Sequence, residues 1–131
     1  MGNRAVIQFT DTPIGIYLHW NGGRNSVEAF LQGAREMGIH GQDTSYRLAR
    51  FTQLVGNFFG GTYSLGIGLV EHLDTDNYDN GVYLVDNEMQ IISRYHFTGI
   101  EQQDPPAEDI LEQVIENNRE HFSQEKTNAK V

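Results

Sequence analysis

Residues 14–37, IGIYLHWNGGRNSVEAFLQGAREM, place a strand, a glycine loop and a helix in direct succession. Side chains alternate along a strand, so Ile14, Ile16, Leu18 and Trp20 fall on one face and are expected to meet the helices. This part therefore predicts a strand that ends in Trp20 as a core anchor.

After the loop the hydrophobic pattern changes to a helical one. Apolar side chains recur at helical spacing in Val27, Phe30, Leu31, Ala34 and Met37. Asn25 and Glu28 fit a variant of the capping box, and Gly38 suits the end of the helix. The sequence thus predicts a helix that follows the loop directly.

Working outward, Arg4–Phe9 and the strand of residues 14–20 flank the turn signal Asp11-Thr12-Pro13, which predicts a hairpin. A second amphipathic helix is expected over about Ser45–Phe59, ended by Gly60-Gly61. Thr62–Val70 alternates leucine and isoleucine with glycine, which suits a strand, with an irregular loop as the alternative.

The second half predicts another hairpin, Val82–Val85 with Met89–Phe97, and a C-terminal helix with Asp104 as N-cap and Pro105 at its first position. A polar, frayed tail is expected from about residue 124. The sequence therefore predicts one α+β domain over residues 1–131. Its antiparallel sheet would have four to five strands, in two hairpins, packed by about three helices.

The glycine loop has the elements of a small anion site. The first N–H groups of a helix lack internal partners, and its dipole favours negative charge. The candidate ligand residues are Tyr17, His19, Asn21, Gly22, Gly23, Arg24, Asn25 and Ser26. The alternative is that the glycines only reverse the chain, because the full dinucleotide fingerprint and the lysine of a phosphate-binding loop are missing.

Charge is distributed unevenly along the chain, whose net charge is −9. Residues 1–60 contain five basic and four acidic side chains, whereas residues 61–131 contain four and fourteen. Such an acidic half repels nucleic acid and attracts a basic protein surface, although it also confers solubility. The candidate partner-binding residues are Asp74, Asp76, Asp79, Glu108, Asp109, Glu112, Glu116 and Glu120.

The segment His72–Gly81 gathers carboxylates, amides and an imidazole. It does not fit the EF-hand pattern, because Asp79 stands where glycine is required. Asp and Asn also favour turns, and Asn80-Gly81 is a turn dipeptide. A structural turn, an ion site and a partner contact all remain open for this segment, and no metal ligands are assigned.

Catalysis finds little support in the motifs. The chain has no cysteine, and no nucleophile-elbow or helical two-histidine zinc motif is present. No catalytic residues or cofactor are assigned, and the protein is expected not to be an enzyme. The absence of a signal peptide and of a long apolar run indicates a soluble, cytoplasmic protein with no membrane contact.

Four motifs carry a resemblance: GNRAVI at residues 2–7, GIYLHWNGG at 15–23, GNFFGG at 56–61 and DNGVY at 79–83. With them, residues 2–97 resemble a family of small uncharacterised proteins of bacteriophages, prophages and other mobile elements. That resemblance implies an accessory protein acting in the host cytoplasm, for example an inhibitor of a defence system.

The leading hypothesis is a non-enzymatic protein that neutralises a host component, such as a CRISPR or other nuclease, by offering its acidic surface to a basic one. One alternative is a small-molecule binder that captures a nucleotide or other phosphorylated signal at the glycine loop. Another is a metal-assisted hydrolase using His72 and the neighbouring aspartates. A homodimer through an exposed hairpin edge or through Phe58-Phe59 is also expected.

Overall fold

The computed structural model describes residues 2–101 and 104–129. Its elements in chain order are β1 (Ala5–Phe9), β2 (Ile14–Leu18), α1 (Arg24–Glu36), α2 (Thr44–Phe59), β3 (Leu65–Leu69), the short 3₁₀ helix η1 (Val70–His72), β4 (Val82–Val85), β5 (Ile91–Tyr95) and α3 (Ala107–Ala129). Within these ranges no helix is long and apolar enough to cross a lipid bilayer.

The five strands form one sheet in the order β3-β2-β1-β4-β5. The pairs β1·β2, β2·β3 and β4·β5 are antiparallel, whereas β1 and β4 run parallel. The predicted α+β class and both hairpins are confirmed. The parallel pair was not predicted, and it arises because the chain crosses from β3 at one edge to β4 on the far side of β1.

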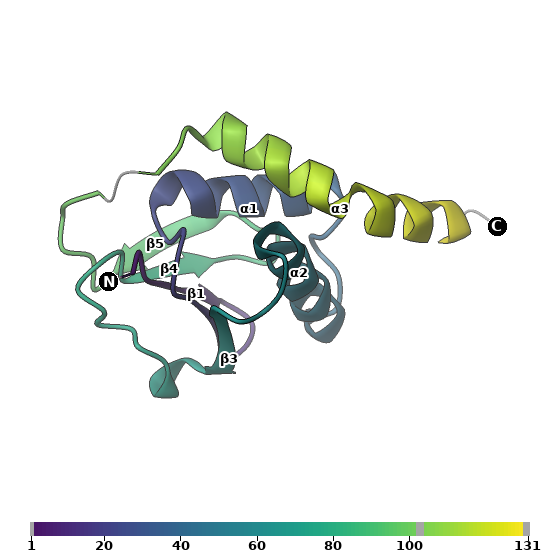
Figure 1. The fold of residues 1–131 in the computed structure, drawn as a ribbon. Coiled ribbons are helices and arrows are strands. Elements are labelled where there is room, and N and C mark those ends of the chain that lie inside the picture. The colour runs from purple at the N-terminus through teal and green to yellow at the C-terminus, as the bar shows by residue number, and fades with distance from the viewer. Residues whose placement is uncertain (1, 102–103, 130–131) are drawn as a thin grey trace.

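The three helices cover one face of the sheet, and α3 lies over α1 and α2 (Figure 1). Their apolar sides meet alternate strand residues such as Ile7, Ile16 and Tyr83, all fully buried with Phe30 of α1. A Cβ at Gly33 would lie 2.7 Å from Val114 Cγ1, so glycine allows α1 and α3 to approach closely.

The other face of the sheet is crossed by the segment 70–81. A Cβ at Gly15 would lie 2.7 Å from Val70 Cγ2, and one at Gly68 would lie 3.6 Å from Leu73 Cδ2. Val6 and Val82 are fully buried but do not belong to the core beneath the helices. Gly15 and Gly68 therefore let this segment pack directly on the strands.

Two local predictions on either side of the glycine loop are wrong. Trp20 is 47% exposed, because β2 ends at Leu18 and Asn21 then adopts φ 56°, so the alternation does not continue. The N-cap of α1 is Gly23 with no side-chain bond, which places Asn25 and Glu28 inside the helix rather than in a capping box.

The start of α3 also differs. The helix begins at Ala107, after Asp104 and Pro105, and the Pro106 carbonyl accepts the first bonds from the N–H groups of Asp109 and Ile110. The Asp104 carboxylate instead accepts a hydrogen bond of 2.6 Å from Asn3 Nδ2. At its other end α3 continues past residue 124, where the sequence favoured a frayed tail.

Candidate functional site

Two regions contain the residues that the sequence singled out. The first is the glycine-loop corner, the end of the sheet where β2 stops and where β1 and β4 begin. Because β1 and β4 are parallel and β2 is antiparallel to β1, the loop 21–23 and the segment 77–81 meet at this same end. The two clusters therefore converge beside Asn3 and Arg4.

Main-chain and amide groups join the two segments through β1. Gly22 N–H donates to the Asn3 carbonyl over 2.8 Å, and Asn80 N–H donates to the Arg4 carbonyl over 3.1 Å. The fully buried Asn80 also donates through Nδ2 to Asn3 Oδ1 over 2.6 Å. A Cβ at Gly22 would lie 2.5 Å from the main-chain carbonyl oxygen of Asn3, so the loop needs glycine here to pack closely against residue 3.

An ion pair closes the same corner. Arg4 Nε donates to Asp79 Oδ2 over 2.7 Å, and the Arg4 N–H donates to the same oxygen over 3.1 Å. The hydrogen bond with Asp79 raises the pKa of Arg4 above its usual range. The Asp79 side chain is only 13% exposed, so it stabilises the fold and is not free for a partner, contrary to the prediction.

The start of α1 already has its own anion. Glu101 Oε1 accepts the Arg24 N–H over 2.9 Å, and Glu101 Oε2 accepts Arg94 Nη1 over 2.8 Å. Burial raises the pKa of Glu101, but the hydrogen bonds and charges of Arg94 and Arg24 outweigh it, so the pKa lies below its usual value. An external phosphate would have to displace this carboxylate.

Arg94 and Tyr83 complete the corner. The Arg94 guanidinium lies 4.4 Å from the centroid of the Tyr83 ring and donates through Nε to the Asn80 carbonyl over 3.1 Å. Tyr83 donates its hydroxyl to the Gly22 carbonyl over 2.8 Å, and burial raises the pKa of that phenol, which stays a donor. The sequence missed Arg94 and Glu101 because they meet the loop only through the tertiary fold.

The remaining predicted ligand residues form separate side-chain contacts. The Tyr17 hydroxyl lies 2.8 Å from His19 Nδ1, and burial raises the Tyr17 pKa. Arg24 pairs with Glu28 along α1 over 3.2 Å. Ser26 is fully buried and accepts a bond from Asn21 Nδ2 over 3.1 Å, whereas Asn25 is exposed.

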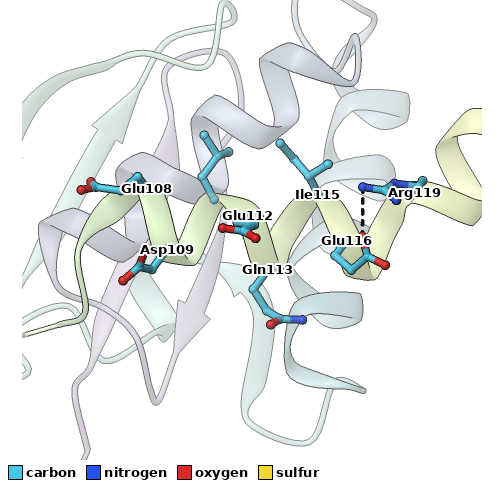
Figure 2. Close-up of a pocket in the computed structure, with 8 residues that line it drawn as sticks. Glu108, Asp109, Glu112, Gln113, Ile115, Glu116 and Arg119 are labelled. Atoms are coloured by element: carbon cyan, nitrogen blue, oxygen red, sulfur yellow. Dashed lines mark ion pairs between the residues drawn. The ribbon is translucent and has the colours of Figure 1, made fainter.

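The second region is the outer face of α3, which we define as the exposed helix surface bearing the row Glu108, Glu112, Glu116 and Glu120 with Asp109, Ile115 and Arg119. Each glutamate of the row is exposed and stands four residues from the next, so the row follows one side of the helix. Figure 2 shows the part from Glu108 to Arg119.

This face is an open surface formed by residues of α3 alone. Arg119 Nη2 lies 3.0 Å from Glu116 Oε2, and Ile115 contributes half-buried aliphatic surface beside the carboxylates (Figure 2). Glu108 and Asp109 stand in the first turn, where the helix dipole favours negative charge. Among residues 2–101 and 104–121, neither the dipole nor an ion pair with another element explains Glu112 and Glu120.

The two acidic clusters do not form one surface. The segment 70–81 packs on the sheet face opposite the helices, so it and α3 lie on opposite sides of the molecule (Figure 1). The prediction of a joint acidic face is therefore wrong. Asp74 and Asp76 have side chains 51% and 69% exposed, and Asp74 lies 3.8 Å from Arg4.

Over residues 2–101 and 104–121 we find no group of three histidine, aspartate or glutamate side chains placed to hold a metal ion. His72 is 71% exposed, and its nearest acidic partner is Glu71 at 3.8 Å. Fold and sites together define the chain as an α+β protein with a mixed five-stranded sheet and an acidic surface helix. Comparison with protein-family models, with curated proteins and with solved structures gave no match.

Proposed function

We propose that the protein is a non-enzymatic binding protein that uses the outer face of α3 to occupy a basic surface of another protein. The observation that carries this proposal is the row Glu108, Glu112, Glu116 and Glu120 at four-residue spacing. Like charges at this spacing repel one another by a few tenths of a kcal/mol per pair, which helix stability alone would not favour.

The density of charge in the row bears on the partner. Four residues of α-helix rise about 6 Å, so the row presents one carboxylate per about 6 Å. One strand of DNA presents one phosphate per about 3.4 Å of helix axis. The row is thus a sparse mimic of a nucleic acid strand, and the apolar surface of Ile115 would supply further contact energy.

The resemblance to proteins of phages and mobile elements directs the proposal to a host target. A nuclease of a defence system offers a basic channel for nucleic acid, and an acidic helix lying in it would exclude the substrate. The shape of the α3 surface supports a macromolecular partner, because this face lies along one helix and is not enclosed by several elements.

The test is inhibition of DNA cleavage by a CRISPR nuclease, together with a measurement of the dissociation constant, at increasing salt. We expect inhibition that weakens steeply with salt and is lost in the double variant Glu112→Gln/Glu116→Gln. The matched control is Asp74→Asn/Asp76→Asn, which removes the same charge on the opposite side of the molecule.

The control separates a defined interface from general acidity. If both double variants lose the same affinity, net charge and not the α3 face determines binding. If neither variant changes it, or if salt has no effect, the proposed interface is wrong.

A further inference from the structure

The outer strand β3 is an edge that lacks the usual protection against pairing. All five of its residues are partly exposed, and its sequence, Leu65-Gly66-Ile67-Gly68-Leu69, contains no charge and no proline. The opposite edge, β5, carries Arg94 and is distorted by a register shift against β4. Charges and bulges are the features that prevent edge strands from pairing, so the two edges differ in kind.

The hydrogen-bond pattern shows which groups of β3 face outward. His19 N–H donates to the Ser64 carbonyl over 3.1 Å, and Val70 N–H donates to the Pro13 carbonyl over 2.9 Å. Bonded positions alternate along an antiparallel ladder, so Gly66 and Gly68 also face β2. The main-chain groups of Leu65, Ile67 and Leu69 therefore point away from the sheet.

The sequence of β3 reads the same in both directions. In an antiparallel pair of two β3 strands centred on Ile67, each leucine lies opposite a leucine, each glycine opposite a glycine, and Ile67 opposite itself. A two-fold interface requires this kind of self-complementary surface. Ile67 would exchange bonds with its counterpart, and Leu69 N–H would donate to the Leu65 carbonyl of the second copy.

One internal bond limits the pairing at the ends of the strand. The Leu65 N–H already donates to the Thr62 carbonyl over 3.1 Å, so each pair of Leu65 with Leu69 of the second copy would form one bond and not two. The Ile67 side chain is 56% exposed and lies beside Ile16 on the helix-covered face. Pairing would bring the two Ile67 side chains together and remove apolar surface from water.

The distribution of charge also favours contact between two copies at the β3 edge. Two copies with a net charge of −9 repel each other, but residues 51–70 contain no charged side chain. The uncharged β3 edge therefore allows two copies to approach with the least repulsion. We propose that the protein forms a two-fold dimer in which β3 pairs antiparallel with β3 of a second copy, centred on Ile67, to give one continuous sheet.

The proposed helical contact through Phe58-Phe59 has less support. Their rings pack against Phe30 with centroids 5.1 Å and 6.1 Å apart, so these side chains belong to the core of one copy. The dimer proposed here also does not depend on the function assigned to α3. It involves a different element and an uncharged surface.

Sedimentation equilibrium of the purified full chain tests the dimer. We expect a dimer for the wild type and at least tenfold weaker association for Ile67→Lys, which places two ammonium groups side by side at the two-fold axis. The matched control is Ile92→Lys on β5, since Ile92 is also 56% exposed. A wild type that is monomeric at several hundred micromolar, or equal loss in both variants, would overturn the proposal.

Salt and cross-linking give two further readouts. Higher salt should strengthen the dimer because it screens the repulsion between acidic copies, whereas it should weaken binding through α3. The chain has no cysteine, so Ile67→Cys gives a single thiol that a short bis-maleimide should join to its counterpart. Equal cross-linking of Ile92→Cys, or none of Ile67→Cys, would contradict the register.

Discussion

The glycine-loop corner and the outer face of α3 use the same kinds of side chain in opposite ways. At the corner, Asp79 and Glu101 bond to arginines and main-chain N–H groups. Along α3, Glu112 and Glu120 stand exposed in a row of like charges. The difference indicates that the corner stabilises the fold, whereas the exposed α3 row is the surface at which we propose that a partner binds.

The largest effect should come from filling space at the corner. Gly81 has φ 70°, and a Cβ there would collide with the Tyr95 carbonyl oxygen and lie 2.6 Å from that of His96. Gly81→Ala combines a left-handed backbone with overpacking and should lower the free energy of unfolding by about 3 kcal/mol. Urea denaturation measures the change.

Gly38 provides the matched control for that substitution. Its φ is 81°, but a Cβ there would meet nothing within 4 Å. Gly38→Ala should therefore cost only the backbone part, about 1 kcal/mol. If the two variants lose the same stability, the glycine-loop corner is less tightly packed than its contacts imply. The contrast between a corner that stabilises the fold and an α3 row that does not would then be wrong.

A smaller loss should follow when the ion pair at the corner is broken. Asp79→Ala leaves Arg4 Nε and the Arg4 N–H without their acceptor, and it should lower the free energy of unfolding by about 1–2 kcal/mol. In the same segment, Asp76 is 69% exposed and lies 4.0 Å from His96. Asp76→Ala should change stability by less than about 0.5 kcal/mol, and an equal effect of both would refute the assignment of Asp79 to the fold.

The fold was more predictable from sequence than this corner. Helical periodicity and the glycines at 38 and 60 gave α1 and α2 almost to the residue, because those signals are local. Glu101 lies 77 residues from the Arg24 N–H that it accepts, and Asn80 lies 77 residues from Asn3. Such contacts follow from the crossover that makes β4 parallel to β1, which no local spacing encodes.

For α3, too, the predictions based on local spacing agree with the structure, whereas those that depend on tertiary contacts do not. The exposure of its carboxylates follows from amphipathic spacing. The N-cap prediction failed because Asp104 is bonded to Asn3 at the glycine-loop corner, a tertiary contact that replaces the local one. Likewise, α3 and the segment 70–81 lie on opposite sides because they cover different faces of the sheet. The local sequence pattern does not indicate which face each of them covers.

The pH dependence of stability should report the bonds made by Glu101. Its pKa lies below the ordinary value of 4.5, so its contribution is complete above that pH and is lost as the pH falls through the lowered pKa. Glu101→Gln should reduce the loss of stability below about pH 4.5, by less than about 1 kcal/mol because the side chain is half exposed. Urea titrations at several acid pH values measure this slope.

Asp11 supplies an internal comparison for that experiment. Burial raises its pKa, but Arg47 and Thr44 outweigh burial and lower it overall, so Asp11 adds its own acid-dependent loss in wild type and variant alike. Only the part of the acid-dependent loss of stability that is due to Glu101 should disappear in Glu101→Gln. An unchanged slope in Glu101→Gln would mean that the carboxylate does not hold the start of α1.

The smallest effect should come from Glu112 on the outer face of α3. Its neighbours four residues away on either side are Glu108 and Glu116, and among residues 2–101 and 104–121 it forms no ion pair. Glu112→Gln removes two repulsive pairs and should raise the free energy of unfolding by a few tenths of a kcal/mol at low salt. The gain should vanish near 1 M salt, where the Debye length falls to about 3 Å.

If the substitution instead lowers stability by more than about 0.5 kcal/mol, Glu112 serves the fold as Asp79 does. A gain in stability that accompanies a loss of partner binding would mean that the row is kept for recognition at a cost to the helix.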